Sequence, residues 1–195
     1  MTKDGYILTT FRIVHPMINS TNTTIRSVIL QHGLFSSSRD FLINAPGGDV
    51  SEQVRMVGNN LGFELAKRGY DVWLTNSRGN KYSMKHISLS RKDSRFWAFT
   101  YADMAKYDVP ANIDYVLEKT GRNDVAYIGY SQGTLMMWGA LSIYEKYNRV
   151  VKPYIALAPV MSLKHVFLPL RAVAHLPLLP DLLGHFNHSC RVLDS

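Results

Sequence analysis

Asp124–Ala140 has the sequence DVAYIGYSQGTLMMWGA, and this stretch decides the fold that we predict for the chain. Val125–Ile128 is a short apolar run with polar residues before it and Gly129 after it, which is typical of a buried strand. Ser131 stands between Gly129 and Gly133, two residues from each. Beyond Gly133, apolar side chains recur at three-residue steps, which predicts a helix.

A strand, the motif G-x-S-x-G and a helix over Thr134–Tyr144, in that order, are the signature of a nucleophile elbow. The turn strains the serine backbone, and a side chain at either glycine would collide with the strand or the helix. The serine Oγ is exposed at the helix N-terminus, where main-chain N–H groups and the helix dipole favour negative charge. We therefore expect Ser131 to be a nucleophile; the alternative is a chance match without chemistry.

A second strand, Arg26–Gln31, ends in His32, Gly33 and Leu34. Acyl transfer needs two main-chain N–H groups directed at the tetrahedral oxyanion. One donor is expected from Gln132, the residue after the nucleophile, and the other from Leu34 at the end of this strand. The alternative interpretation is an ordinary glycine turn with a structural histidine.

Five further segments have strand or helix patterns: strands at Gly5–His15, Asp71–Thr75 and Pro153–Ala158, and helices at Leu61–Arg68 and Asp108–Lys119. Alternating strands and helices predict a mostly parallel sheet with helices on both faces. In such sheets the site lies at the carboxyl ends of strands, where the turn after Gln31 and Ser131 are both expected.

Two local interpretations accompany this scheme. Asp108 precedes Pro110, and we interpret it as the N-cap of a helix that Gly121 ends. An aromatic cluster after a long polar segment (Asn76–Arg95) is expected in the core: Phe96, Trp97 and Phe99.

The chain is predicted to divide into two parts. Residues 1–159 form the core, with the elbow at 129–133, and residues 160–195 begin a helical cap. The cap segment has an apolar stripe that Pro169, Pro177 and Pro180 break into short helices. Contact of this segment with a membrane surface and simple packing on the core are both left open.

The composition is that of a globular protein with a moderate excess of basic residues. The 195 residues are 46% hydrophobic and 19% charged, and the formal net charge is +7. The basic residues are scattered, so we expect a solvated surface and no nucleic acid. No apolar run is long enough to span a bilayer, no signal peptide is recognised, and no metal or cofactor is expected. A single cysteine, Cys190, cannot bridge within the chain.

Five blocks together resemble the acid lipases, the gastric and lysosomal lipases of the α/β-hydrolase fold. The blocks are LQHGLFSSS (Leu30–Ser38), GYDVWLTNSRGN (Gly69–Asn80), FWAFTYADMAKYDVPANIDYVL (Phe96–Leu117), YIGYSQGT (Tyr127–Thr134) and ALAPV (Ala156–Val160). The resemblance implies hydrolysis of neutral lipid esters, triacylglycerols or sterol esters, at a lipid–water interface. It also implies a lysosomal or secreted protein, in which the acceptor patterns at Asn19, Asn22 and Asn187 could carry glycans.

Carried over by position, Ser131 matches the family's nucleophile, and Leu34 and Gln132 match its oxyanion donors. Two positions depart from the family: Tyr130 stands where many relatives have histidine, and the loop Ala45–Asn60 looks longer. The family's cap disulfide would leave Cys190 unpaired.

The family's triad acid and histidine follow later strands, after the cap. We therefore expect neither in this chain and interpret the sequence as part of a longer protein. As a consequence, we expect the chain alone to be inactive. Two alternatives stay open: a truncated product that holds lipid without hydrolysing it, and a compact esterase with an acid and a base from within the chain. The candidates for the latter are Asp181, Asp194, His165, His175, His185 and His188.

Overall fold

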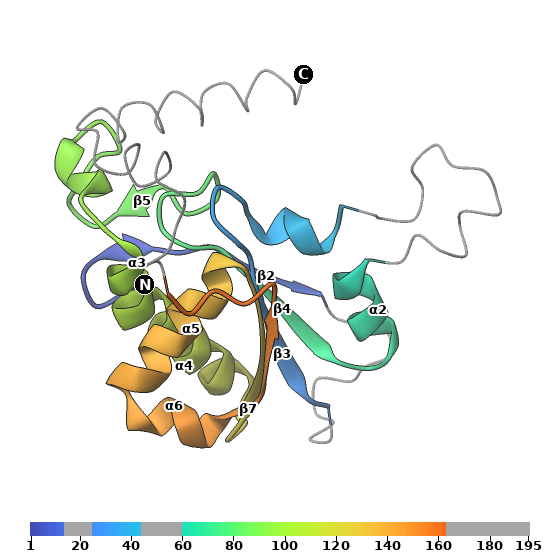
Figure 1. Cartoon of the computed structure of the whole chain (residues 1–195). Coiled ribbons are helices and arrows are strands. Elements are labelled where there is room, and N and C mark those ends of the chain that lie inside the picture. The colour runs from blue at the N-terminus through green and yellow to red at the C-terminus, as the bar shows by residue number, and fades with distance from the viewer. Residues whose placement is uncertain (14–24, 44–59, 163–195) are drawn as a thin grey trace, which may run out of the picture.

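A central sheet organises the computed structural model, which describes residues 1–13, 25–43 and 60–162 (Figure 1). Within these residues the strand order is β2-β4-β3-β6-β7. The strands are β2 (Thr10–Ile13), β3 (Ser27–Gln31), β4 (Asp71–Thr75), β6 (Val125–Tyr130) and β7 (Val151–Leu157). All neighbours are parallel except β2, which pairs antiparallel with β4. The mostly parallel sheet predicted from the sequence is confirmed.

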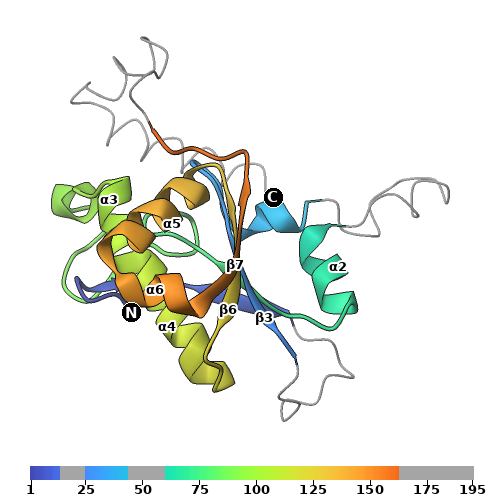
Figure 2. The same ribbon diagram turned by 60° about the horizontal axis from the view of Figure 1, so that its bottom comes forward.

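Helices cover both faces of the sheet, as the edge-on view makes clear (Figure 2). One face carries α4 (Val109–Thr120), α5 (Gln132–Ile143) and α6 (Glu145–Val150), and the other carries α2 (Leu61–Lys67) and the short η1 (Ser38–Phe41). Two apolar cores fill these layers: Ile29, Tyr127 and Met136 belong to the first, and Leu30 and Leu74 to the second. The central strands are therefore apolar on both faces, which explains their continuous apolar runs.

The helix around Asp108 differs from its sequence interpretation. A short α3 (Tyr101–Asp103) continues through a π-helical segment, η3 (Met104–Asp108), directly into α4. Asp108 has helical dihedrals and makes no capping hydrogen bond, so the N-cap prediction is wrong. Gly121 does end α4, in the left-handed conformation that glycine adopts without strain.

The N-terminal strand predicted over Gly5–His15 is also wrong as a single element. Tyr6–Ile7 (β1) pairs with Lys85–His86 (β5) in a separate two-stranded sheet, whereas β2 joins the central sheet. Thr9 separates the two because its N–H and Oγ1 bond to the segment after β4, at Ser83 and Tyr82. A local alternation of side chains could not reveal a chain that changes sheets.

The strand predicted at Asp71–Thr75 has the predicted bounds, and the other predicted strands and helices are present with shifted ends. The polar segment Asn76–Arg95 contains β5 and the start of η2 (Ser94–Trp97), and α6 was not predicted. Of the aromatic cluster expected in the core, Phe96 is fully buried, whereas Trp97 and Phe99 are only partly buried. No helix among the described residues is both long and apolar enough to cross a bilayer. The predicted cap beyond Ser162 lies outside the described residues, so the division at 159/160 stays a prediction.

Candidate active site

Ser131 occupies the corner between β6 and α5. Its dihedrals are φ 51° and ψ −115°, a combination that L-residues seldom adopt and that costs roughly 1–3 kcal/mol. Hydrogen bonds on both sides hold this corner: Ser131 N–H donates to Leu157 O at 2.9 Å, and Thr134 Oγ1 donates to Ser131 O at 2.6 Å. The turn is therefore stabilised by the end of β7 and by the first turn of α5.

The two flanking glycines are required by close packing. A Cβ on Gly129 would lie 2.9 Å from the carbonyl carbon of Gly133, and a Cβ on Gly133 would lie 2.6 Å from Gln31 O. Both clashes are with backbone, which cannot move aside as a side chain could. The motif therefore lets the start of α5 pack directly on the ends of β6 and β3.

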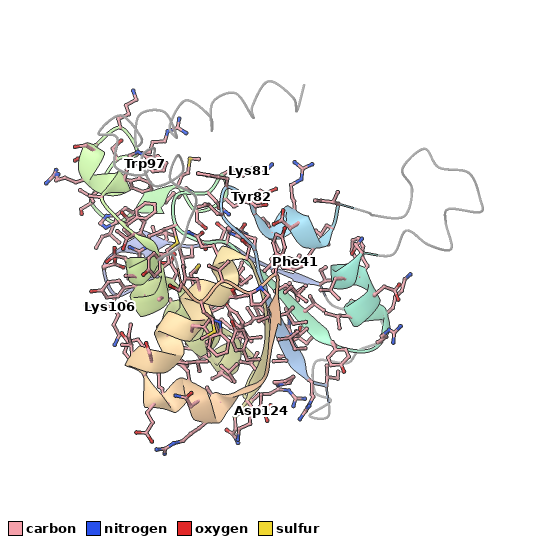
Figure 3. All side chains as sticks on the ribbon, viewed as in Figure 1. Phe41, Lys81, Tyr82, Trp97, Lys106 and Asp124 are labelled. Atoms are coloured by element: carbon pink, nitrogen blue, oxygen red, sulfur yellow. The ribbon has the colours of Figure 1, made fainter. Side chains whose placement is uncertain are left out.

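His32, Gly33 and Leu34, which we call the HGL turn, touch this corner from the end of β3. A Cβ on Gly33 would lie 3.2 Å from Ser131 Cβ and 3.1 Å from the Tyr130 ring. The carboxyl ends of the parallel strands form one rim of the sheet. Figure 3 shows this rim, because Lys81 and Tyr82, which follow β4, lie at the opposite end of the sheet from Asp124, which precedes β6. The HGL turn and the serine corner thus meet at the carboxyl end of the sheet.

The two expected oxyanion donors are free to bind an anion. Among the described residues, neither Leu34 N–H nor Gln132 N–H has a hydrogen-bond acceptor. Gln132 is the first residue of α5, where the helix dipole adds partial positive charge. Their role as oxyanion donors stays a prediction, and the structure brings the two turns together at the carboxyl end of the sheet.

Backbone strain marks the same rim. In the described part of the chain, the non-glycine residues with positive φ are Phe35, Ser131 and Ala158. They follow β3, β6 and β7 closely, and strained residues of this kind cluster at functional sites. Apolar side chains there face solvent, since Leu34 is 52% and Phe35 75% exposed.

Sequence reasoning missed the loop after β4 as part of this site. Residues 76–80, the NSRGN loop, pack under the HGL turn, and Asn76, Ser77 and Arg78 are all buried. Ser77 N–H donates to His32 Nε2 at 3.1 Å, and Ser38 N–H donates to Asn76 Oδ1 at 3.0 Å. The signal was available, because polar residues directly after a buried parallel strand lie at the carboxyl rim.

Arg78 anchors the NSRGN loop through a buried ion-pair network. Its Nε donates to Asp108 Oδ1 at 2.8 Å, its N–H donates to Asp108 Oδ2 at 2.9 Å, and its Nη1 donates to Asp4 Oδ2 at 2.6 Å. The guanidinium also lies 4.0 Å above the ring of Tyr6. Asp108 therefore has a structural task, although a different one from the predicted helix cap.

Burial and pairing act in opposite directions on the two carboxylates. Burial raises the pKa of Asp108 to about 6, although Arg78 acts to lower it. At Asp4 burial also acts to raise the pKa, but the hydrogen bonds from Arg78 and Thr2 outweigh it and hold the pKa below its usual value. Asp4, the more exposed of the two carboxylates, therefore keeps its negative charge beside Arg78 to a lower pH than Asp108 does.

No histidine or carboxylate of residues 1–13, 25–43 and 60–162 hydrogen-bonds to Ser131 Oγ. The six candidates for an acid and a base within the chain all lie outside the described residues, as do Cys190 and the three glycan acceptor patterns. The same described segments hold no cluster of three potential metal ligands.

Comparison with known families gives matches over nearly the whole chain. The family model described as "alpha/beta hydrolase fold" matches residues 26–186, and one described as "Partial alpha/beta-hydrolase lipase region" matches residues 1–45. Epoxide Hydrolase A from Mycobacterium thermoresistibile superposes with a TM-score of 0.50 at 17% identity, covering 88% of this chain and 42% of that one. The predicted α/β-hydrolase fold is confirmed.

Two curated relatives show a closer similarity. Gastric triacylglycerol lipase of Rattus norvegicus is 42% identical over 178 residues, which cover 91% of this chain and 42% of the relative. Lysosomal acid lipase/cholesteryl ester hydrolase of Macaca fascicularis is 41% identical over 186 residues, which cover 94% of this chain and 44% of the relative. The resemblance to acid lipases is confirmed, and the chain spans less than half the length of these relatives.

Proposed function

This chain belongs to the α/β-hydrolase family, and we propose that it supplies the nucleophile and the oxyanion hole of a lipase. The observation that carries the proposal is the contact between the HGL turn and the Ser131 corner, where the N–H groups of Leu34 and Gln132 find no acceptor in the described part of the chain. Acyl transfer needs a hydroxyl beside two free main-chain donors, and this contact supports such an arrangement.

The proposed chemistry follows from these positions. Ser131 Oγ attacks the ester carbonyl carbon, and the carbonyl oxygen, now negative, accepts hydrogen bonds from the N–H groups of Leu34 and Gln132. The alcohol then leaves, an acyl-enzyme remains on Ser131, and water releases the acid. The proton of Ser131 needs a base, which the described residues do not provide at Oγ. Without a base, the oxyanion hole and binding alone give roughly 10³–10⁴ over water.

We propose neutral lipid esters as the substrate class. The relatives are named for triacylglycerol and cholesteryl esters, and their names fit a secreted or lysosomal protein. The rim supports this class because it carries several large apolar side chains that are exposed: Leu34, Phe35, Tyr130 and Met161. Such a surface would face the lipid side of a lipid–water interface.

Replacement of Ser131 by alanine tests the proposal in the protein expressed from its complete coding sequence. Hydrolysis of a triacylglycerol emulsion and of a cholesteryl ester should fall by a factor on the order of 10⁴ or more. Ser142→Ala is the matched control, because Ser142 lies on the same helix, is exposed and donates only to Gly139 O. Hydrolysis that survives Ser131→Ala would refute the proposed role. Lipid binding without Ser131-dependent hydrolysis would instead support the alternative, a truncated product that holds lipid without hydrolysing it.

A further inference from the structure

The His32 ring lies between the HGL turn and the NSRGN loop and is 3% exposed. Its Nδ1 is 2.8 Å from Gly33 O, and its Nε2 is 3.1 Å from the main-chain N of Ser77. A carbonyl oxygen can only accept and a main-chain N–H can only donate. The Gly33 contact therefore requires a hydrogen on Nδ1, and the Ser77 contact requires that Nε2 carries none.

Asn80 reinforces this assignment from the far side of the NSRGN loop. Its Oδ1 accepts from the N–H groups of Tyr82 and Ser83, at 3.0 and 3.1 Å, which fixes the orientation of the amide. Its Nδ2 then faces His32 Nε2 at 3.1 Å as a second donor. A proton on Nε2 would point at two N–H groups, so the protonated ring does not fit this site.

The hydrogen bond at Nδ1 controls the direction of a catalytic donor. Gly33 C=O and Leu34 N–H belong to one planar trans peptide unit, in which the two bonds point in opposite directions. Glycine does little to restrict the rotation of this unit. Whatever holds the Gly33 carbonyl therefore also aims the Leu34 N–H.

We propose that His32 is a positioning residue, which aims the Leu34 N–H at the oxyanion through Gly33 O and which the NSRGN loop keeps as a neutral Nδ1–H tautomer in acid. The inference rests on the proposed function, since it concerns the oxyanion hole of that reaction. It gives the buried NSRGN loop a task in catalysis: the loop fixes the histidine, and the histidine fixes the peptide unit.

The surroundings of the ring explain how it stays neutral as the medium becomes acidic. Burial lowers the pKa of His32 below its ordinary value, and it outweighs the opposite effects of the Gly33 hydrogen bond and the charge of Asp40. Asp40 belongs to η1, and the groups that face Nε2, from Ser77 and Asn80, carry no charge. An unperturbed histidine would gain a proton near about pH 6.5, whereas this one should not.

Two substitutions of His32 each keep the hydrogen bond of one ring nitrogen and remove that of the other. Asn at position 32 can place its Nδ2 where Nδ1 now donates to Gly33 O, but it loses the acceptor for Ser77. Gln can place its Oε1 where Nε2 now accepts from Ser77, but it loses the donor to Gly33. We expect His32→Gln to lower kcat about 10²-fold with little change in KM, because one oxyanion donor is misdirected. His32→Asn should stay within about tenfold of wild type, the scale of one lost hydrogen bond.

Measurements on the protein expressed from its complete coding sequence decide between positioning and a purely structural role. Kinetics use a soluble short-chain p-nitrophenyl ester, and urea unfolding checks that both variants are folded. A long-range ¹H–¹⁵N spectrum of the wild type, with His32 assigned by loss of its signals in His32→Gln, should show a hydrogen on Nδ1 and none on Nε2 at every pH from about 4 to 7.

The inference is overturned if His32→Gln keeps the wild-type kcat, or if both variants lose kcat equally. A ring that carries its hydrogen on Nε2, or that titrates across this pH range, overturns it as well. Failure of the proposed function would look different: hydrolysis would survive Ser131→Ala, while the spectrum would still report the tautomer of His32.

Discussion

Ser131 and His32 show how single residues at this rim depend on neighbours that lie far away in the sequence. The strained backbone of Ser131 was predictable because its glycines are visible in the motif, and their backbone clashes explain why they are needed. The sequence placed His32 only in the turn that holds the expected oxyanion donor Leu34. Its tautomer depends on Ser77 N–H, a contact across 45 residues, so no local pattern could have shown it.

The buried neutral state of His32 predicts a pH dependence of stability. Because burial lowers its pKa in the folded protein, below about pH 6.5 the unfolded chain binds a proton that the folded protein excludes. The free energy of unfolding should therefore decrease as the pH falls, and His32→Asn should remove this contribution. The difference between wild type and variant should be constant above about pH 7.5 and change as the pH falls through about 6.5, by at most about 1.4 kcal/mol per pH unit. Urea unfolding over this range measures it, and a constant difference throughout would contradict a depressed pKa.

At the scale of elements, the NSRGN loop joins the sheet to the helical layer. Arg78 connects the end of β4 to the last residue of η3 and to Asp4, before β1. From sequence, Asp108 two residues before Pro110 indicated a helix start, because an N-cap aspartate and an aspartate that pairs with a distant residue look alike in the local sequence. The π-helical segment that carries Asp108 into α4 depends on this partner 30 residues away.

Removal of the guanidinium should therefore destabilise several elements together. In Arg78→Met the Asp108 side chain, 0% exposed, would lose its counter-charge, which should cost about 3–5 kcal/mol of unfolding free energy. The double variant Arg78→Met/Asp108→Asn should recover part of this loss, because no buried charge is left behind. Arg95→Met is the control, since the 76% exposed Arg95 pairs only with nearby Asp93, and a change within about 0.5 kcal/mol is expected. Equal effects of Arg78→Met and Arg95→Met in urea unfolding would show that the buried network does not stabilise the fold.

At the scale of the whole molecule, the strand order brings the HGL turn and the Ser131 corner, which are far apart in the sequence, to the same end of the sheet. Alternating apolar strands and helices were enough to predict this sheet, because parallel strands buried on both faces have continuous apolar runs. They could not predict that the N-terminal segment splits between two sheets, which depends on bonds from Thr9 to Tyr82 and Ser83. The convergence of the HGL turn and the Ser131 corner is therefore a property of the topology as much as of the motif.

The most direct test of this account is the structure of a covalent adduct between an alkyl phosphonate ester and the protein expressed from its complete coding sequence. We predict phosphorus bound to Ser131 Oγ, with the phosphoryl oxygen about 2.7–3.1 Å from the main-chain nitrogens of both Leu34 and Gln132. A phosphonate attached to another residue, or a phosphoryl oxygen directed away from these two N–H groups, would contradict the account.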